Sequence, residues 1–229
     1  MSSLTRAAGA AASLFGLALA APAAAADDSQ LWTNATAVVK LSDRWRLSED
    51  LTFRFSDKRN GLYEIESNTL VGYRLSKVVT VWAGYTHDPQ YSGGDFTIME
   101  RRAREQVSFD NFAPVGPGKL SGRLRLEQRW REGLDGTGWR VRPYLKYTLP
   151  IKKGARTGFV FSTEPFLNLN TTPFQRTDGL DRVRSLVAFT TPLNKKIAIE
   201  VGYLNQHTFV RHGPDADDHV ASLSLSLSL

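Results

Sequence analysis

The amino-acid sequence predicts an all-β protein: a single antiparallel up-and-down transmembrane β-barrel of ten or twelve strands, preceded by an N-terminal signal peptide. Three observations predict this fold. The chain starts with a short apolar segment that ends in small residues, its remainder alternates apolar and polar residues, and its last residues alternate leucine and serine. The sequence therefore divides into a signal peptide at 1–26 and one barrel domain at 27–229.

The N-terminal segment has the order of a secretory signal peptide. Arg6 supplies a positive charge, residues 7–21 are mostly apolar, and Ala24 and Ala26 form a small-x-small cleavage site. The apolar run is shorter than the ~20 residues that a membrane-spanning helix needs, and no second long apolar stretch follows. We therefore expect export to the outer membrane of a Gram-negative cell.

Composition narrows the expected partners. The 229 residues contain no cysteine, which excludes disulfides and thiolate chemistry, and the formal net charge is +6. A basic balance can indicate nucleic acid, but an exported chain is not expected to meet it. Outer-membrane lipid and lipopolysaccharide, which carry anionic headgroups, are the expected neighbours.

The period-two alternation predicts the strands. In 119–131, for example, Arg123, Arg125 and Glu127 share one face, whereas Leu124 and Leu126 share the other. Eleven segments follow this pattern: 31–41, 44–56, 62–75, 77–87, 96–109, 119–131, 139–149, 157–170, 179–190, 195–209 and 218–229. Bacterial single-chain barrels have even strand numbers, so we expect the true number to be ten or twelve.

The connections and the aromatic residues support a membrane barrel. With the C-terminus on the periplasmic side, the segments 42–43, 76, 111–118, 150–156 and 191–194 are inner turns, and 57–61, 88–95, 132–138, 171–178 and 210–217 are outer loops. Aromatic residues gather near both strand ends: Trp45, Tyr73, Phe109, Tyr147 and Phe189 on the inner side, and Tyr85, Trp130, Trp139, Tyr203 and Phe209 on the outer side. Two such belts are typical of membrane barrels.

The charged strand faces are expected to line the lumen. Closure would place the apolar faces against lipid and leave no sheet edge unpaired. The residues expected inside carry both signs and form a lumen charge network: Glu64, Glu66, Arg123, Arg125, Glu127, Arg129, Arg140, Arg142, Glu164, Arg182, Arg184 and Glu200. Long arginine side chains paired with glutamate should make this lumen plugged or very narrow, unlike that of a large porin.

Three features fit this pattern less well. Segment 96–109 carries charge on both faces, which predicts a charged end above the membrane or a β-bulge. Glu49 falls on an apolar face. The final strand keeps its alternation, as expected of a strand read by the outer-membrane assembly machinery, but it ends in Leu229 instead of an aromatic residue.

The search for chemistry favours a protein that is not an enzyme. The histidines His87, His207, His212 and His219 all fall at outer strand ends or loops, where a lipid-modifying hydrolase would keep its site. However, no Gly-x-Ser-x-Gly elbow, phosphate loop, dinucleotide fingerprint or zinc motif is present, so we expect no metal and no cofactor. A structural barrel or narrow passive pore is the leading hypothesis, a His-based outer-rim hydrolase the second, and a soluble periplasmic β-sandwich the third.

Several short motifs also resemble a known bacterial family. They are Gln30-Leu31-Trp32-Thr33, Val71-Gly72-Tyr73, Ala83-Gly84-Tyr85, Glu100-Arg101-Arg102, Arg125-Leu126-Glu127-Gln128-Arg129, Ser162-Thr163-Glu164-Pro165-Phe166 and Gly202-Tyr203 with Gln206. On these residues the chain resembles the outer-membrane proteins grouped as domain of unknown function 2490, across nearly the whole barrel domain. The resemblance implies an outer-membrane β-barrel, and it implies no substrate and no catalytic residue.

Overall fold

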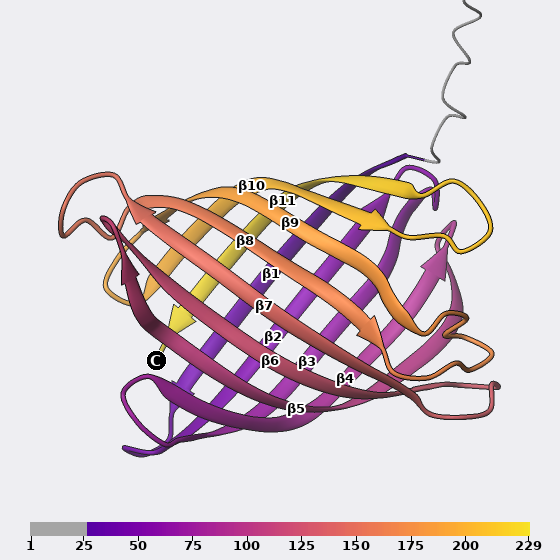
Figure 1. Cartoon of the computed structure of the whole chain (residues 1–229), viewed down its shortest axis with the longest axis horizontal. Coiled ribbons are helices and arrows are strands. Elements are labelled where there is room, and N and C mark those ends of the chain that lie inside the picture. The colour runs from indigo at the N-terminus through magenta and orange to yellow at the C-terminus, as the bar shows by residue number, and fades with distance from the viewer. Residues whose placement is uncertain (1–26) are drawn as a thin grey trace, which may run out of the picture.

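A computed structural model describes residues 27–229, and in it eleven strands close into one barrel (Figure 1). The predicted signal peptide at 1–26 lies outside the described residues. The strands are β1 (Asp28–Lys40), β2 (Trp45–Ser56), β3 (Gly61–Arg74), β4 (Val79–Ser92), β5 (Asp95–Val115), β6 (Gly118–Arg131), β7 (Gly138–Pro150), β8 (Gly158–Asn168), β9 (Gly179–Pro192), β10 (Ile197–Thr208) and β11 (Ala216–Ser228).

The predicted strand number of ten or twelve is wrong. All eleven alternating segments form strands, and the odd number closes because β1 pairs with β11 in parallel, from Asp28 beside Asp218 to Val38 beside Ser228. The other ten neighbouring pairs are antiparallel, so the expectation of a purely antiparallel barrel fails at this single seam. Parallel closure places the start of β1 and the end of β11 at opposite ends of the barrel (Figure 1).

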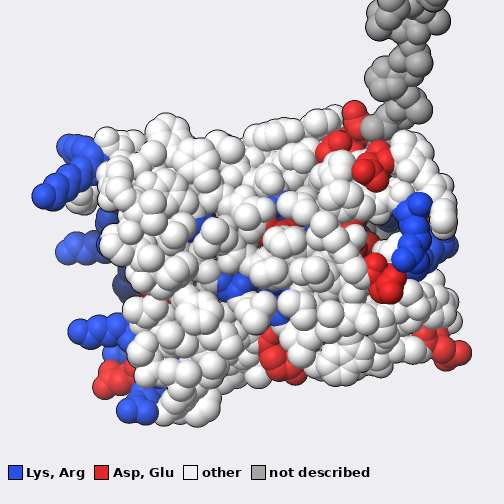
Figure 2. Space-filling model, viewed as in Figure 1, with Lys and Arg blue, Asp and Glu red and all other residues white. Residues whose placement is uncertain are grey.

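The alternation sorts side chains between the two faces of the wall as predicted. Outward-facing Leu124, Val187 and Val201 are each more than half exposed, whereas inward-facing Arg104 and Glu127 are buried. Figure 2 shows a wall that is mostly free of charge between two charged ends. Because one closed sheet surrounds a polar interior, the β-sandwich architecture is wrong. Within residues 27–229, no helix is long and apolar enough to span a membrane.

The two barrel ends differ in charge. One end of the barrel holds Leu229, and we call it the C-terminal end; the opposite end is called the loop end. The turns at the C-terminal end are 41–44, 75–78, 116–117, 151–157 and 193–196. The C-terminal end exposes nine basic side chains: Lys40, Arg44, Lys77, Lys119, Lys152, Lys153, Arg156, Lys195 and Lys196. Acidic residues near them include Asp43 and Asp110, so this end is strongly basic, as the left side of Figure 2 shows.

Aromatic side chains lie on the outer wall toward both ends. At the C-terminal end, Trp45 packs edge-on against Tyr73 with ring centroids 5.0 Å apart, and Phe159 packs against Phe189 at 5.7 Å. Toward the loop end, Trp130 and Trp139 are exposed, and the Trp130 indole N–H donates to the Thr137 hydroxyl. The arrangement is that of two belts separated by an aliphatic band.

Strand β5 contains the segment 96–109, in which the sequence places charges on both faces. It is longer than predicted and includes most of the expected turn at 111–118, with a β-bulge between Phe109 and Ala113 where Asn111 takes a positive φ of 48°. Glu105 points outward, and its carboxylate accepts a hydrogen bond from Gln128 at 3.1 Å. The bulge lies after the charged residues of β5 and therefore does not change which way they point. Both faces of β5 carry charge.

Glu49 also points outward, and local hydroxyl groups satisfy it. Ser67 and Thr69 on the neighbouring strand β3 donate to its two carboxylate oxygens at 2.8 and 2.5 Å. The wall therefore carries a polar spot where the alternation alone predicts an apolar one.

Candidate functional site

The lumen contains a connected network of buried ion pairs. Nine arginines and six carboxylates are joined within 4.0 Å: Arg54, Arg102, Arg104, Arg123, Arg125, Arg129, Arg131, Arg140 and Arg142 with Glu64, Glu66, Asp88, Glu100, Glu127 and Glu164. We call this set the charge network. Its residues come from the inner faces of β2 to β8, and they therefore cover most of the lumen wall.

Glu66 is the shared acceptor for three arginines of the network. Its carboxylate accepts hydrogen bonds from Arg104 at 2.8 Å, Arg102 at 3.1 Å and Arg54 at 3.3 Å. These arginines lie on β2 and β5, while Glu66 lies on β3, so one carboxylate connects strands that are not all neighbours. Glu64, also on β3, accepts a second bond from Arg54 at 2.6 Å.

Glu127 joins a second part of the network. It is fully buried, and its two oxygens lie 2.5 Å from Arg140, 2.8 Å from Arg142 and 3.2 Å from Arg104. Arg142 continues to Glu164 on β8 at 2.9 Å, which Arg123 also contacts. Charge-assisted bonds of this kind are the strong ones, and each buried carboxylate here has several partners to offset its desolvation.

Glu100 joins the part nearest the loop end. It accepts from Arg102 at 2.6 Å, from Arg129 at 2.8 and 3.0 Å, and from Arg131 at 2.6 Å. Arg102 also contacts Asp88 of β4. Because nine guanidinium groups face six carboxylates, the network has an excess of positive charge.

Two aromatic rings that face the lumen stack against arginine side chains. Trp32 of β1 lies beneath Arg54 and Arg184, whose guanidinium carbons are 4.3 and 4.5 Å from the ring centroid. Phe166 of β8 lies beneath Arg142 at 4.2 Å and Arg184 at 4.7 Å. Such contacts fix the planar groups without neutralising their charge.

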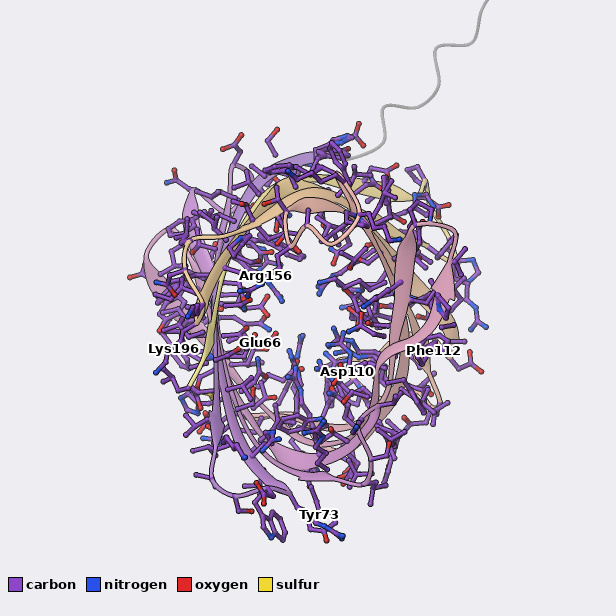
Figure 3. The ribbon with its side chains drawn as sticks, turned by 90° about the vertical axis from the view of Figure 1, so that its left-hand side faces the viewer. Glu66, Tyr73, Asp110, Phe112, Arg156 and Lys196 are labelled. Atoms are coloured by element: carbon purple, nitrogen blue, oxygen red, sulfur yellow. The ribbon has the colours of Figure 1, made fainter. Side chains whose placement is uncertain are left out.

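Part of the remaining lumen wall, on β1 and β11, carries short uncharged side chains. Asn34 and Thr36 of β1 and Ser222 and Ser224 of β11 line the lumen opposite the charge network. Small side chains there leave room in front of the long arginines. Viewed along the barrel, the side chains surround a central space (Figure 3).

Three cavities follow one another along this space. A loop-end cavity of about 370 Å³ is lined by residues that include Arg59, Arg129 and Arg182, and a C-terminal-end cavity of about 580 Å³ by residues that include Arg74 and Asp110. A middle cavity of about 250 Å³ is lined by residues that include Ser222 and Ser224 of β11. Arg54 is among the lining residues of all three cavities, so the three cavities adjoin at this residue.

Most of the predicted lumen residues fall in the charge network. Nine of them are joined there: Glu64, Glu66, Arg123, Arg125, Glu127, Arg129, Arg140, Arg142 and Glu164. The other three also face the lumen but lie apart. Arg182 contacts the adjacent Asp181 at 2.7 Å, Arg184 stacks on the two rings, and Glu200 lies 3.7 Å from Lys146.

The predicted set missed Arg54, Asp88, Glu100, Arg102, Arg104 and Arg131. Period two is present in Glu100, Arg102 and Arg104, but the outward charges of Arg101 and Glu105 conceal it. The sequence predicts an outer loop at Asp88, whereas β4 continues to Ser92. Arg54 alternates with Phe53 and Phe55, and this signal was sufficient to find it.

The histidines do not form a nucleophile–base pair. His207 lies 3.1 Å from Asp217 and 3.3 Å from Asp215, and the His219 ring bonds the Tyr203 hydroxyl at 2.6 Å, while His87 is exposed on the outer wall. Across residues 27–229, no serine or threonine hydroxyl hydrogen-bonds to a histidine ring. The geometry therefore gives a hydrolase no support.

A cluster of three carboxylates in the lumen has the spacing of a metal site. Glu64, Glu66 and Asp88 each offer an oxygen within 4.8 Å of the others. However, Arg54 and Arg102 already contact these carboxylates, and their charges oppose binding of a cation.

Comparisons with known proteins agree with the predicted resemblance. An uncharacterised protein of Methylorubrum extorquens is 29% identical over 201 residues, which cover 86% of each chain. Among solved structures, an anion-selective porin from Comamonas acidovorans matches 82% of this chain with a TM-score of 0.38 and 13% identity, and the match spans 54% of that porin. The family model described as "Protein of unknown function (DUF2490)" matches residues 29–217, so this chain belongs to that family.

Proposed function

We propose that the chain is a non-enzymatic outer-membrane barrel that forms a narrow passive pore. The observation that carries the proposal is the series of three cavities along a lumen whose wall is held by the charge network. Ordered ion pairs keep the arginines against the wall, and the short residues of β1 and β11 leave the route beside them. Such a route suits small solutes and excludes large ones.

The outer wall supports placement in a membrane. Its aliphatic band lies between two aromatic belts, and its strands of 11 to 21 residues reach or exceed the ~9–11 residues that a tilted strand needs to cross a bilayer. With the C-terminal end in the periplasm, the longer loops of the loop end face lipopolysaccharide. The basic side chains of the C-terminal end then face the phosphates of the inner leaflet. We propose that the assembly machinery recognises β11 through its Leu/Ser alternation.

Glu105→Leu tests the membrane placement. The Glu105 carboxylate lies on the outer wall with one hydrogen bond, so in a bilayer its replacement by leucine should raise the free energy of unfolding by about 1–2 kcal/mol. Urea unfolding in phosphatidylcholine vesicles, followed by tryptophan fluorescence, measures the change. Glu132→Leu, in the loop-end connection after β6, is the matched control and should have little effect. Equal effects of the two variants would contradict a lipid-facing position for Glu105.

Planar-bilayer recording tests the pore. The wild-type barrel should give a small single-channel conductance, and Arg54→Ala with Glu64→Ala should raise it by roughly twofold or more, because Arg54 narrows the junction of the cavities. The double variant keeps the net charge and leaves Glu66 paired with Arg102 and Arg104.

The control for that recording removes an ion pair outside the lumen. Arg211→Ala with Asp178→Ala deletes a contact of 3.1 Å between exposed side chains, and it should leave the conductance unchanged. If neither the wild-type barrel nor the Arg54/Glu64 variant conducts, the pore is contradicted and the charge network has a structural role alone.

A further inference from the structure

We propose that the loop-end cavity binds a small polyanion, a solute that carries two or more phosphate or carboxylate groups. This inference deepens the proposed pore and rests on it only in requiring that solutes reach the cavity from the loop end. The cavity is about 370 Å³ and is lined mainly by polar atoms of charged side chains. Ten lining residues are arginine or lysine, and four are aspartate or glutamate.

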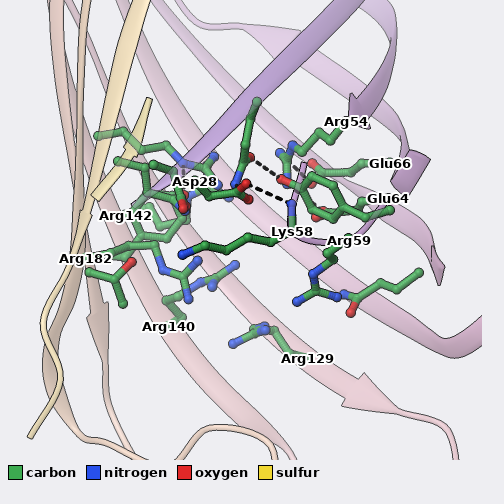
Figure 4. A pocket seen from close by; sticks show the side chains of 18 of the residues that line it. Asp28, Arg54, Lys58, Arg59, Glu64, Glu66, Arg129, Arg140, Arg142 and Arg182 are labelled. Carbon is green, nitrogen blue, oxygen red and sulfur yellow. Dashed lines mark hydrogen bonds and ion pairs between the residues drawn. The ribbon is translucent and has the colours of Figure 1, made fainter. Parts of the chain in front are cut away.

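Three of the lining cations have no acidic partner. Among residues 27–229, no carboxylate lies within 4.0 Å of the charged groups of Lys58, Arg59 or Arg184. Lys58 and Arg59 belong to the turn between β2 and β3, so they enter the cavity from its mouth, and Arg184 enters from the wall of β9. Figure 4 shows the nitrogen ends of Lys58, Arg59, Arg129 and Arg140 directed into one shared space.

Arg184 is held in place without being neutralised. Its Nε donates to Gln206 at 2.8 Å, and its guanidinium plane lies over Trp32 and Phe166. Neither contact supplies a negative charge. A planar guanidinium group fixed in this way is prepared to bond an incoming carboxylate or phosphate, because little side-chain entropy remains to be lost.

The acidic residues of the cavity lie beyond 4.0 Å from the charged groups of these three cations. Asp28 accepts hydrogen bonds from the Ser56 hydroxyl, the Gln30 amide and the Lys58 backbone N–H. Asp218 accepts from Gln206 at 2.6 Å. Glu64 and Glu66 are engaged by arginines of the charge network. Because ten cations outnumber four carboxylates in its lining, the cavity has an excess of positive charge.

The surroundings strengthen attraction for anions. A recess whose lining has an excess of one sign of charge raises the local concentration of counter-ions. Two or more arginines within one recess favour a ligand with several anionic groups over a monoanion such as chloride. The cavity also continues toward the middle cavity past Arg54 and Arg184, so a bound polyanion would lie on the proposed route.

Titration calorimetry on the whole folded barrel in zwitterionic micelles tests the site. Pyrophosphate and citrate serve as probes, which separates a phosphate from a carboxylate preference. We expect saturable binding with one site per barrel, and Lys58→Gln with Arg59→Gln should weaken it by about tenfold. Arg176→Gln with Arg211→Gln removes the same charge from exposed loop-end positions outside the cavity, and it should leave the affinity unchanged.

The outcomes separate this site from the pore. Binding of neither probe by the wild-type barrel, or equal weakening by the two double variants, overturns the anion site even where bilayer recording shows conductance. Saturable binding that Lys58→Gln with Arg59→Gln weakens establishes the site, and it does so even where the barrel does not conduct and the pore is contradicted.

Discussion

Glu127→Leu is expected to lower the free energy of unfolding by about 3–5 kcal/mol, because it leaves several buried guanidinium groups without their shared carboxylate. Arg140, Arg142 and Arg104 all lie within 3.2 Å of the Glu127 oxygens, and Arg140 has no other carboxylate within 4.0 Å among residues 27–229. Denaturant unfolding in micelles, followed by tryptophan fluorescence, measures the loss.

Glu200→Leu is the matched control for that measurement. It removes another lumen-facing glutamate, but the only charged contact of Glu200 among the described residues is with Lys146 at 3.7 Å, and both side chains remain partly exposed. A partly solvated pair of this kind contributes about 0–1 kcal/mol. If the two variants are equally stable, the charge network does not hold the wall together.

Leu124→Arg should have the second large effect. Leu124 is 52% exposed in the middle of β6, and its outer-face neighbours across the two adjacent ladders are Val107 and Pro143. In a bilayer an arginine at this depth should lower the free energy of unfolding by about 2–4 kcal/mol. Unfolding in vesicles is the measurement, and a barrel exposed to water at this position would lose far less.

Leu134→Arg provides the control for the lipid-facing prediction. It makes the same substitution at a residue that is 40% exposed, but in the connection between β6 and β7 at the loop end. There the arginine stays in water or among headgroups, and little change is expected. A loss at Leu134 as large as that at Leu124 would contradict a bilayer boundary between the two positions.

The sequence was sufficient to predict the barrel wall because alternation is a local property. Each strand needs only its own residues to decide which face is apolar, and all eleven alternating segments form strands. The closure was beyond this reasoning, because the parallel seam joins residues near opposite ends of the chain. The extension of β5 to Val115 was missed because the positive φ of Asn111 and the bulge interrupt the alternation.

The membership of the charge network was largely predictable, but its pairing was not. Alternation placed Glu66 and Glu127 inside, since each shares a face with neighbouring charges. Which arginine reaches which carboxylate depends on register and on the crossing of side chains over intervening strands. Arg104 bonds Glu66, 38 residues away and two strands distant, and no local pattern in the sequence indicates that contact.

The parallel seam between β1 and β11 constrains how the barrel can be assembled. Ten strands divide evenly into five hairpins, but eleven leave one strand outside any such division. Because β1 and β11 run in the same direction, no hairpin can template their pairing. The contacts of this seam span almost the whole described chain, and contacts between residues so distant in sequence are the slowest to form.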